Sequence, residues 1–159
     1  MERIKRILNH DEYNHHLENN SRAEEKRGFC RHDLQHFLAV ARVGYIIALE
    51  RRYKVSKEMI YAAALLHDIA KWKQYLEGVN HAIASAKVAE DLLEECGFSP
   101  EETKTISDAI KKHRKGKDLE TELDISLYEG DKKSRLCVKC HKLSDCKKYK
   151  EGKKPQIQY

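Results

Sequence analysis

The chain has 159 residues, of which 40% are hydrophobic and 36% are charged, with seven glycines and two prolines. This length suits one domain with one core, and the scarcity of glycine and proline favours a helical fold. The longest mainly apolar run, residues 40–49, is interrupted by Arg42 and is far shorter than the roughly 20 residues of a membrane span. No secretory signal is visible at the N-terminus, so we expect a cytoplasmic protein with no membrane partner.

The net charge of +5 is unevenly distributed along the chain. Residues 132–154 contain ten Lys or Arg and two acidic residues, a net +8, which leaves −3 for the remainder. A basic segment can bind an anionic partner such as nucleic acid or a phosphorylated substrate, but no aromatic-rich platform for single strands accompanies it. We therefore expect a solvated basic tail, with nucleic-acid docking as the less favoured alternative.

Residues 1–18 predict a short helix that caps the domain, because three aliphatic side chains recur at helical spacing: Ile4, Ile7 and Leu8. Three nearby histidines lack carboxylate or cysteine partners at ligand spacing, and we expect them at the surface: His10, His15 and His16. Residues 19–27 are polar and charged, which favours a loop or a frayed helix end.

Residues 33–53 predict the first long helix, with two adjoining apolar stripes at i, i+3 and i+4 spacing. His36 belongs to one of these stripes, so its side chain should point inward. Ser56 is a candidate N-cap of a second helix that we expect to continue to Ala70. This helix contains most of the segment AAALLHDIAKW (62–72), in which an adjacent histidine and aspartate end an apolar run. Residues 71–79 read as a short connection.

Three more helices are predicted in the second half of the chain. Asn80 can cap a helix over residues 81–96. Gly97 follows this helix, and glycine is a frequent helix terminator. Residues 99–102 (Ser-Pro-Glu-Glu) form a capping box for a helix that ends near Gly116. A last core helix is expected over residues 121–136. No strand alternation is visible, so we predict an all-α, single-domain bundle of five to six core helices.

Six ionisable side chains fall on or beside the apolar faces of these helices. They are His36, His67, Asp68, His81, His113 and Asp131. One buried histidine is usually satisfied by a local hydrogen bond, but a set of this size is costly to bury without a common partner. A metal ion in a helical bundle would neutralise the carboxylates and use the imidazoles as ligands. Fe, Mn, Co, Ni and Zn all suit such a site.

The ordered pattern of His36, then LLHDIAK with His67 and Asp68, then Asp131 in a late helix resembles the HD superfamily of metal-dependent phosphohydrolases. The resemblance covers about residues 29–136. It implies a helical HD-type bundle in which these four residues bind one divalent metal ion.

A subset of this superfamily inserts two further histidines that bind a second metal, and His81 and His113 match them. The resemblance implies that Asp68 bridges the two ions and is a catalytic residue, as in the similar symmetrical diadenosine tetraphosphatase branch. Small members often place an alanine before the last aspartate, whereas this chain has Gly130, at which the helix could bend. Glu129 is the alternative carboxylate if the helix register differs.

The resemblance implies hydrolysis of a phosphomonoester or phosphoanhydride bond in a nucleotide-like substrate. Two metals about 3.5–4 Å apart can lower the pKa of a bridging water and clamp the attacking and leaving oxygens. Lys71, one turn after the His-Asp pair, matches a lysine of relatives and is the second catalytic candidate, placed to neutralise a phosphate oxygen. Arg114 is a weaker phosphate-binding candidate. Trp72 and Tyr75 could stack on a base, although core or rim positions suit them equally.

Two alternatives to this activity remain open at this point. One is a metal-retaining module that senses a nucleotide, or docks nucleic acid through its basic tail, without turnover; the complete ligand set favours the enzyme. The other is an oxygenase-type reaction, which a mixed-valent diiron subset of the family performs. The expected organisation is an N-terminal helix and loop (1–28), the HD domain (29–136) and a basic cysteine-containing tail (137–159).

Three cysteines follow the last ligand helix in a segment too poor in apolar residues to fold by burial alone: Cys137, Cys140 and Cys146. Disulfides are disfavoured in the cytosol, so this spacing predicts a metal knuckle that needs a fourth ligand. Cys30 is the first candidate, and His32 or His141 could replace it. We expect a structural Zn²⁺, with an iron–sulfur cluster or free thiols as alternatives. Cys96 is expected to be a small buried residue.

Overall fold

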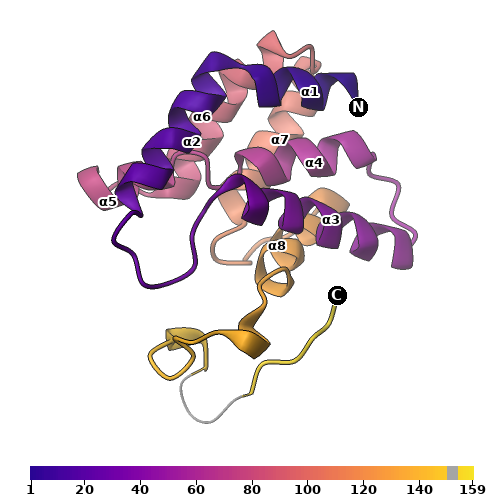
Figure 1. Cartoon of the computed structure of the whole chain (residues 1–159). Coiled ribbons are helices and arrows are strands. Elements are labelled where there is room, and N and C mark those ends of the chain that lie inside the picture. The colour runs from indigo at the N-terminus through magenta and orange to yellow at the C-terminus, as the bar shows by residue number, and fades with distance from the viewer. Residues whose placement is uncertain (150–153) are drawn as a thin grey trace.

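A computed structural model describes residues 1–149 and 154–159. These residues form eight α-helices and no β-strand, which confirms the predicted all-α fold (Figure 1). The helices are α1 (Glu2–Asn9), α2 (Asp11–Ala23), α3 (Leu34–Glu50), α4 (Lys57–Leu66), α5 (Lys71–Glu77), α6 (His81–Glu95), α7 (Pro100–Lys112) and α8 (Glu122–Lys133), followed by the short 3-10 helices η1 (Cys137–Lys139) and η2 (Lys147–Tyr149). None of the helices in the described part of the chain has the length and apolar character of a membrane span.

Side-chain caps begin most of the core helices where the sequence predicts them. Ser56 Oγ accepts a hydrogen bond from a first-turn backbone N–H of α4 at 3.1 Å, and Asn80 caps α6 in the same way. Ser99 and Glu102 form the predicted capping box of α7, and Thr121 opens α8 with a second box. Each cap contributes about 1 kcal/mol, so the starts of these helices are determined locally.

The core lies where five helices meet: α3, α4, α6, α7 and α8. α3 packs against α4 and α8, and α7 packs against α4, α6 and α8. Large apolar side chains from four of these helices are fully buried at these contacts, among them Phe37, Leu65, Leu92 and Ile106. Burying each contributes about 1.5–3 kcal/mol relative to exposure. This packing holds the helix ends that carry the ionisable cluster.

The N-terminal region contains two helices, where the sequence predicts one short helix and a loop. The break falls at His10, whose extended backbone ends α1 and whose Nδ1 accepts a hydrogen bond from the Glu12 N–H at 3.2 Å to start α2. α2 then continues to Ala23, through part of the predicted loop. Both helices pack on the core through three buried side chains: Ile4, Ile7 and Tyr13.

α4 is shorter than predicted, and most of the predicted connection 71–79 forms helix α5. α4 ends one residue before the His-Asp pair, residues 67–70 form a turn, and α5 follows. The turn is held from outside, because the Ala70 N–H donates to Ser85 Oγ of α6 at 3.0 Å and the Asn20 side-chain amide of α2 donates to the Asp68 carbonyl oxygen at 2.9 Å. Helix periodicity does not reveal these tertiary contacts.

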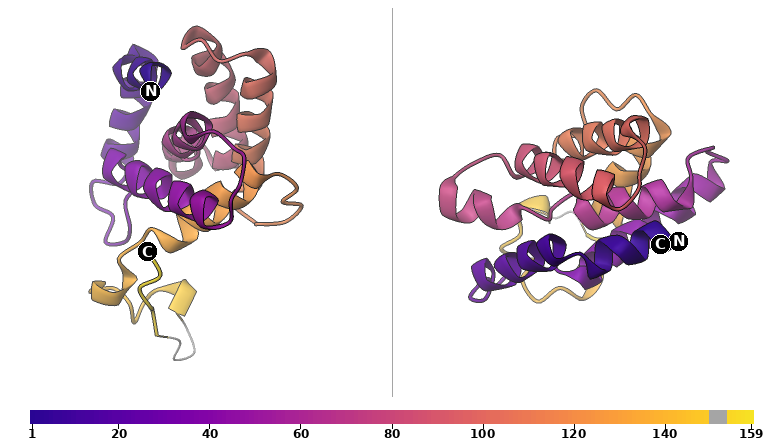
Figure 2. Two further views of the ribbon diagram at one scale, coloured as in Figure 1. Left: turned by 90° about the vertical axis from the view of Figure 1, so that its right-hand side faces the viewer. Right: turned by 90° about the horizontal axis from the view of Figure 1, so that it is seen from above.

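The described part of the segment after α8 lies outside the helical bundle. In Figure 1 it runs below α8 and the loop that joins α2 to α3, and the left view of Figure 2 shows the same separation. The Arg135 guanidinium donates to the Arg31 carbonyl oxygen at 2.7 Å and joins this segment to that loop. Of the predicted basic stretch 132–154, residues 150–153 lie outside the described part of the chain.

Candidate metal centre

The structure brings all six predicted metal ligands into one cluster at the ends of α4 and α7, the start of α6 and the inner faces of α3 and α8. Their ligand atoms form two groups, and within each group the atoms lie within 4.8 Å of one another. The first group is His36, His67, Asp68 and Asp131, and the second is Asp68, His81 and His113. Asp68 is shared by both groups.

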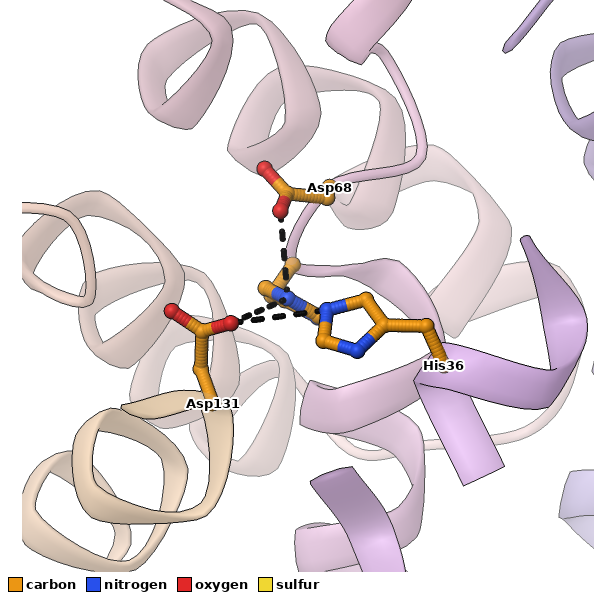
Figure 3. Close-up of side chains that lie close together, drawn as sticks. His36, Asp68 and Asp131 are labelled. Carbon is orange, nitrogen blue, oxygen red and sulfur yellow. Dashed lines mark ion pairs between the residues drawn. The ribbon is translucent and has the colours of Figure 1, made fainter. Parts of the chain in front are cut away.

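The first group has the composition of a complete site for one divalent ion. Asp131 Oδ1 lies 3.4 Å from His36 Nε2 and 3.9 Å from His67 Nε2 (Figure 3). Asp68 Oδ2 lies 3.3 Å from His67 Nε2. Two imidazoles and two carboxylates from two helices and one turn therefore face a common point, a ligand set that suits several transition metals.

The second group uses the other oxygen of the shared carboxylate. Asp68 Oδ1 lies 3.1 Å from His81 Nε2 and 3.6 Å from His113 Nε2. The two oxygens of Asp68 thus face different sets of histidines. A carboxylate in this position can contact two metal ions at once.

The hydrogen bonding of the cluster fits a metal. Three of its buried ligand atoms have no hydrogen-bond partner: His36 Nε2, His67 Nε2 and Asp68 Oδ1. Leaving such an atom unpaired costs about 1–3 kcal/mol. The Nδ1–H groups of His67 and His113 each donate to the carbonyl oxygen three residues earlier, at 2.7 Å and 2.6 Å. Each of these rings therefore directs its Nε2 lone pair into the cluster.

The protonation states also suit metal binding. Burial lowers the pKa of His36 to about 4 and that of His81 to about 3, so both imidazoles are neutral near pH 7. Burial alone would raise the pKa of Asp68 and of Asp131, but the neighbouring imidazoles hold both carboxyls well below their usual range. Burial opposes protonation of His67, yet Asp68 outweighs it and raises the pKa of His67. Neutral imidazoles and ionised carboxylates are the forms that bind a divalent ion.

Comparison with known proteins decides the family. The HD domain family model matches residues 33–147, well over half of the chain. The chain belongs to the HD domain family. An uncharacterized protein of Clostridium beijerinckii is 39% identical over 160 residues, and the match covers 100% of each chain. A crystal structure of a predicted HD superfamily hydrolase from an uncultured Thermotogales bacterium matches with a TM-score of 0.58 and 28% identity, over 75% of this chain and 66% of that one.

A third similarity is confined to part of the chain. The bifunctional uridylyltransferase/uridylyl-removing enzyme of Azospirillum brasilense is 42% identical over 59 residues, which are 37% of this chain and 6% of that protein. Together these findings confirm the predicted superfamily and its helical fold. HD membership implies divalent-metal binding, and the His/Asp cluster is able to hold a metal. The matched range also extends past residue 136, where the predicted HD domain ends.

A cavity of about 300 Å³ opens onto the cluster of six candidate metal ligands, which we call the HD cluster. Five cationic side chains line it: Lys71, Arg114, Lys132, Arg135 and Lys148. The first two are the predicted substrate-binding cations. Lys71 Nζ lies 3.1 Å from His81 Nδ1, and burial lowers the pKa of Lys71. Cations gathered beside these candidate metal ligands favour an anionic ligand.

Trp72 and Tyr75 do not line this cavity, and of the two alternatives left open for them their contacts match the core or rim position. Trp72 Nε1–H donates to His16 Nδ1 at 2.9 Å, and the Tyr75 hydroxyl donates to Glu24 Oε1 at 2.7 Å. Both side chains thus join α5 to α2 and the residue that follows it. His16, which we expected at the surface, is buried by the same contact.

Asp131 is the carboxylate that α8 contributes to the HD cluster, and the alternative, Glu129, is wrong. Glu129 pairs with Arg51 at 2.7 Å and with Lys133 at 2.6 Å. α8 also continues through Gly130 without interruption, to Lys133. Gly130 is buried against α3, and this contact sets the position of the aspartate that follows it.

His32 is a further imidazole at the HD cluster, which the sequence suggested only as a substitute cysteine-site ligand. Its Nε2 lies 3.6 Å from Asp68 Oδ2, and its Nδ1–H donates to Glu24 Oε1 at 2.5 Å. Burial alone would raise the pKa of Glu24, but His32 lowers it to about 2. A buried carboxylate on the far nitrogen orients an imidazole toward a metal or substrate. The one sequence signal was the spacing of four residues to His36.

The four cysteines predicted to hold a structural metal line a second cavity, of about 310 Å³: Cys30, Cys137, Cys140 and Cys146. Their sulfur atoms do not reach the mutual spacing of the His/Asp ligand groups. Metal binding by these cysteines therefore stays a prediction. Cys96 is buried on α6, as expected.

Proposed function

We propose that this HD protein is a divalent-metal-dependent phosphohydrolase that cleaves a phosphomonoester or phosphoanhydride bond of a nucleotide-like substrate. The observation that carries the proposal is the position of Asp68, whose two oxygens lie 3.1–3.6 Å from imidazoles of two different groups. A pair of divalent ions would supply phosphate charge neutralisation and a water of lowered pKa. The presence of all six candidate ligands supports catalytic activity over a binding role alone.

The surrounding side chains orient these ligands. The Nδ1–H of His81 donates to Gln74 Oε1, so His81 Nε2 faces Asp68. Lys71 lies on the cavity side of this pair, where its ammonium group can bind a phosphate oxygen of the substrate. His32, oriented by Glu24, is placed to hold a proton at Nε2 beside the cluster.

The charge of the cavity supports a substrate with more than one phosphate charge. Five cations line it, against the two carboxylates that the metals would neutralise. The local similarity to the uridylyl-removing enzyme of Azospirillum brasilense supports the nucleotide-like part of the proposal, because that name describes removal of a nucleotidyl group.

The test is a hydrolysis panel of nucleotides and dinucleoside polyphosphates with Mn²⁺, Fe²⁺ or Co²⁺, with metal content measured in the same samples. We expect turnover of at least one substrate class and loss of both turnover and metal in Asp68→Ala. Asp124→Asn is the matched control, since Asp124 is equally buried but binds Lys112 at 3.0 Å and caps α8. It should retain metal and turnover.

Two results would count against the enzyme. A protein that binds metal and nucleotide but turns over no member of the panel would instead be a nucleotide-sensing module. A protein that binds no divalent ion under any of these conditions would contradict both readings.

A further inference from the structure

The segment after α8 has little apolar burial to hold it in place. Leu136 is 78% exposed, and the regular structure in the described residues of this segment (134–149 and 154–159) is limited to η1 and η2, of three residues each. Polar contacts attach it at three points: Arg135 donates to the Arg31 carbonyl oxygen at 2.7 Å, Lys148 donates to the Lys132 carbonyl oxygen at 2.7 Å, and the Tyr159 hydroxyl donates to Glu50 Oε2 at 3.1 Å. Such a segment needs a further crosslink to keep one position.

Cysteines from both sides of this contact meet at one cavity. Cys30 lies on the loop between α2 and α3, the other three lie after α8, and all four line the same space of about 310 Å³. The Cys140 N–H donates to the Cys137 carbonyl oxygen at 3.1 Å, which closes the Cys-x2-Cys pair into one tight turn. A crosslink here would join segments more than 100 residues apart in the chain.

The chemistry of this cavity suits zinc. Four thiolates in a set containing Cys-x2-Cys form a closed structural zinc site. Lys139 and Lys142 line the same cavity, and their charges offset the negative charge of four thiolates around a divalent ion. The HD cluster has no sulfur ligand, so the two kinds of site differ chemically.

The same segment also forms a wall of the HD cavity. Three of the cysteines, Cys30, Cys137 and Cys146, line both cavities. Arg135 and Lys148 line the HD cavity beside them. Whatever fixes the cysteines therefore fixes two of the five cations that face the HD cluster.

We propose that these four cysteines bind a structural zinc ion: Cys30, Cys137, Cys140 and Cys146. The ion draws the thiols to ligand spacing and clamps the segment after α8 over the HD cavity, so that Arg135 and Lys148 face the substrate phosphate. The zinc site stands independently of the proposed phosphohydrolase activity, whereas the placement of the two cations for substrate rests on it.

Cobalt substitution tests the site directly, because thiolate-to-cobalt charge-transfer absorption requires sulfur ligands. Wild-type protein and Cys96→Ala should show this absorption with one thiolate-bound ion per chain. The double variant Cys137→Ala/Cys140→Ala should lose it and keep its HD-site metal and its helical circular dichroism. The proposal is overturned if the wild type shows no such absorption, if the double variant retains it, or if the protein as purified shows iron–sulfur absorption.

Inorganic phosphate tests the second part without turnover. Its Kd for the metal-loaded protein should weaken about tenfold in the double variant relative to Cys96→Ala, which corresponds to the loss of roughly one charged contact. An unchanged phosphate Kd would overturn the placement of Arg135 and Lys148. Neither measurement needs a known substrate, so both still test this proposal if the phosphohydrolase proposal fails.

Discussion

Gly130 of α8 lies directly against Gly44 of α3. A Cβ on Gly130 would stand 2.8 Å from the Val40 carbonyl oxygen and 3.2 Å from the Gly44 Cα. The two helices therefore approach more closely than any side chain at Gly130 would allow. Asp131 follows directly, and its Oδ1 lies 3.4 Å from His36 Nε2 on α3. The glycine contact thus sets the distance between two candidate metal ligands.

Gly130→Ala should lower both stability and metal affinity. Alanine stabilises an open helix position by about 1 kcal/mol relative to glycine, but overpacking against a backbone carbonyl typically costs about 1–3 kcal/mol. We expect the free energy of unfolding to fall by up to about 2 kcal/mol and the metal to bind more weakly as α8 moves from α3. Denaturant titration and metal titration by calorimetry measure the two effects.

Gly28→Ala is the control for this substitution, because its Cβ would meet only the Lys142 Cε at 3.6 Å, an ordinary contact. It should leave both quantities unchanged. A Gly130→Ala protein as stable as the wild type, with full metal affinity, would contradict the close approach of α3 and α8.

Removing one histidine from either ligand group should remove one ion and leave the other. His36→Ala acts on the first group and His113→Ala on the second, whereas Asp68→Ala acts on both. We expect each histidine variant to lower the affinity for the ion of its own group by more than about 100-fold, beyond the effect typical of an outer-shell partner. Elemental analysis after gel filtration gives the metal count per chain. Loss of all metal in both histidine variants would indicate a single site.

Lys71→Met should reduce kcat/KM and leave the metal content unchanged. Loss of a hydrogen bond to a charged phosphate costs about 1.5–3 kcal/mol, or roughly 10- to 100-fold in kcat/KM. Lys73→Met is the matched control, because Lys73 belongs to the same helix but lies over the Trp72 ring and lines a different cavity. Equal effects of the two substitutions on turnover would contradict a phosphate contact at Lys71.

His16 should make stability depend on pH. Burial, together with Lys73 and His15, lowers the pKa of His16 from 6.5 to about 4. Between these values the unfolded chain binds a proton that the folded chain does not, so the free energy of unfolding falls as the pH decreases from about 6.5 to about 4. At higher pH this contribution is fully present.

His16→Gln keeps an oxygen acceptor for the Trp72 indole and removes the titration. The stability difference between wild type and His16→Gln should therefore shrink as the pH falls through this window, measured by urea titration of both proteins at equal metal content. His15→Gln, an exposed change on the same helix, should follow the wild type. A difference that stays constant from pH 7 to pH 4 would exclude His16 as the source.

The helical fold follows from interactions within a few residues, and these are visible in the sequence. The capping box at Ser99 and the caps at Ser56 and Asn80 lie where they were predicted, because a cap involves neighbours in one turn. The ordered histidines and aspartates indicated the HD family before the structure did. The end of α4 and the presence of α5 were missed, since contacts from α2 and α6 determine that turn.

The sequence by itself determined the helical class, most helix starts and the residue types of a metal centre. The tertiary structure alone decided three further features. The two oxygens of Asp68 face different histidines, and Glu24 holds His32 beside them. Trp72 contacts α2 instead of the cavity. The physical reason is the separation along the chain over which each kind of interaction acts. Periodicity and capping act within one or two turns, whereas each of these partnerships depends on how helices distant in the chain pack against one another.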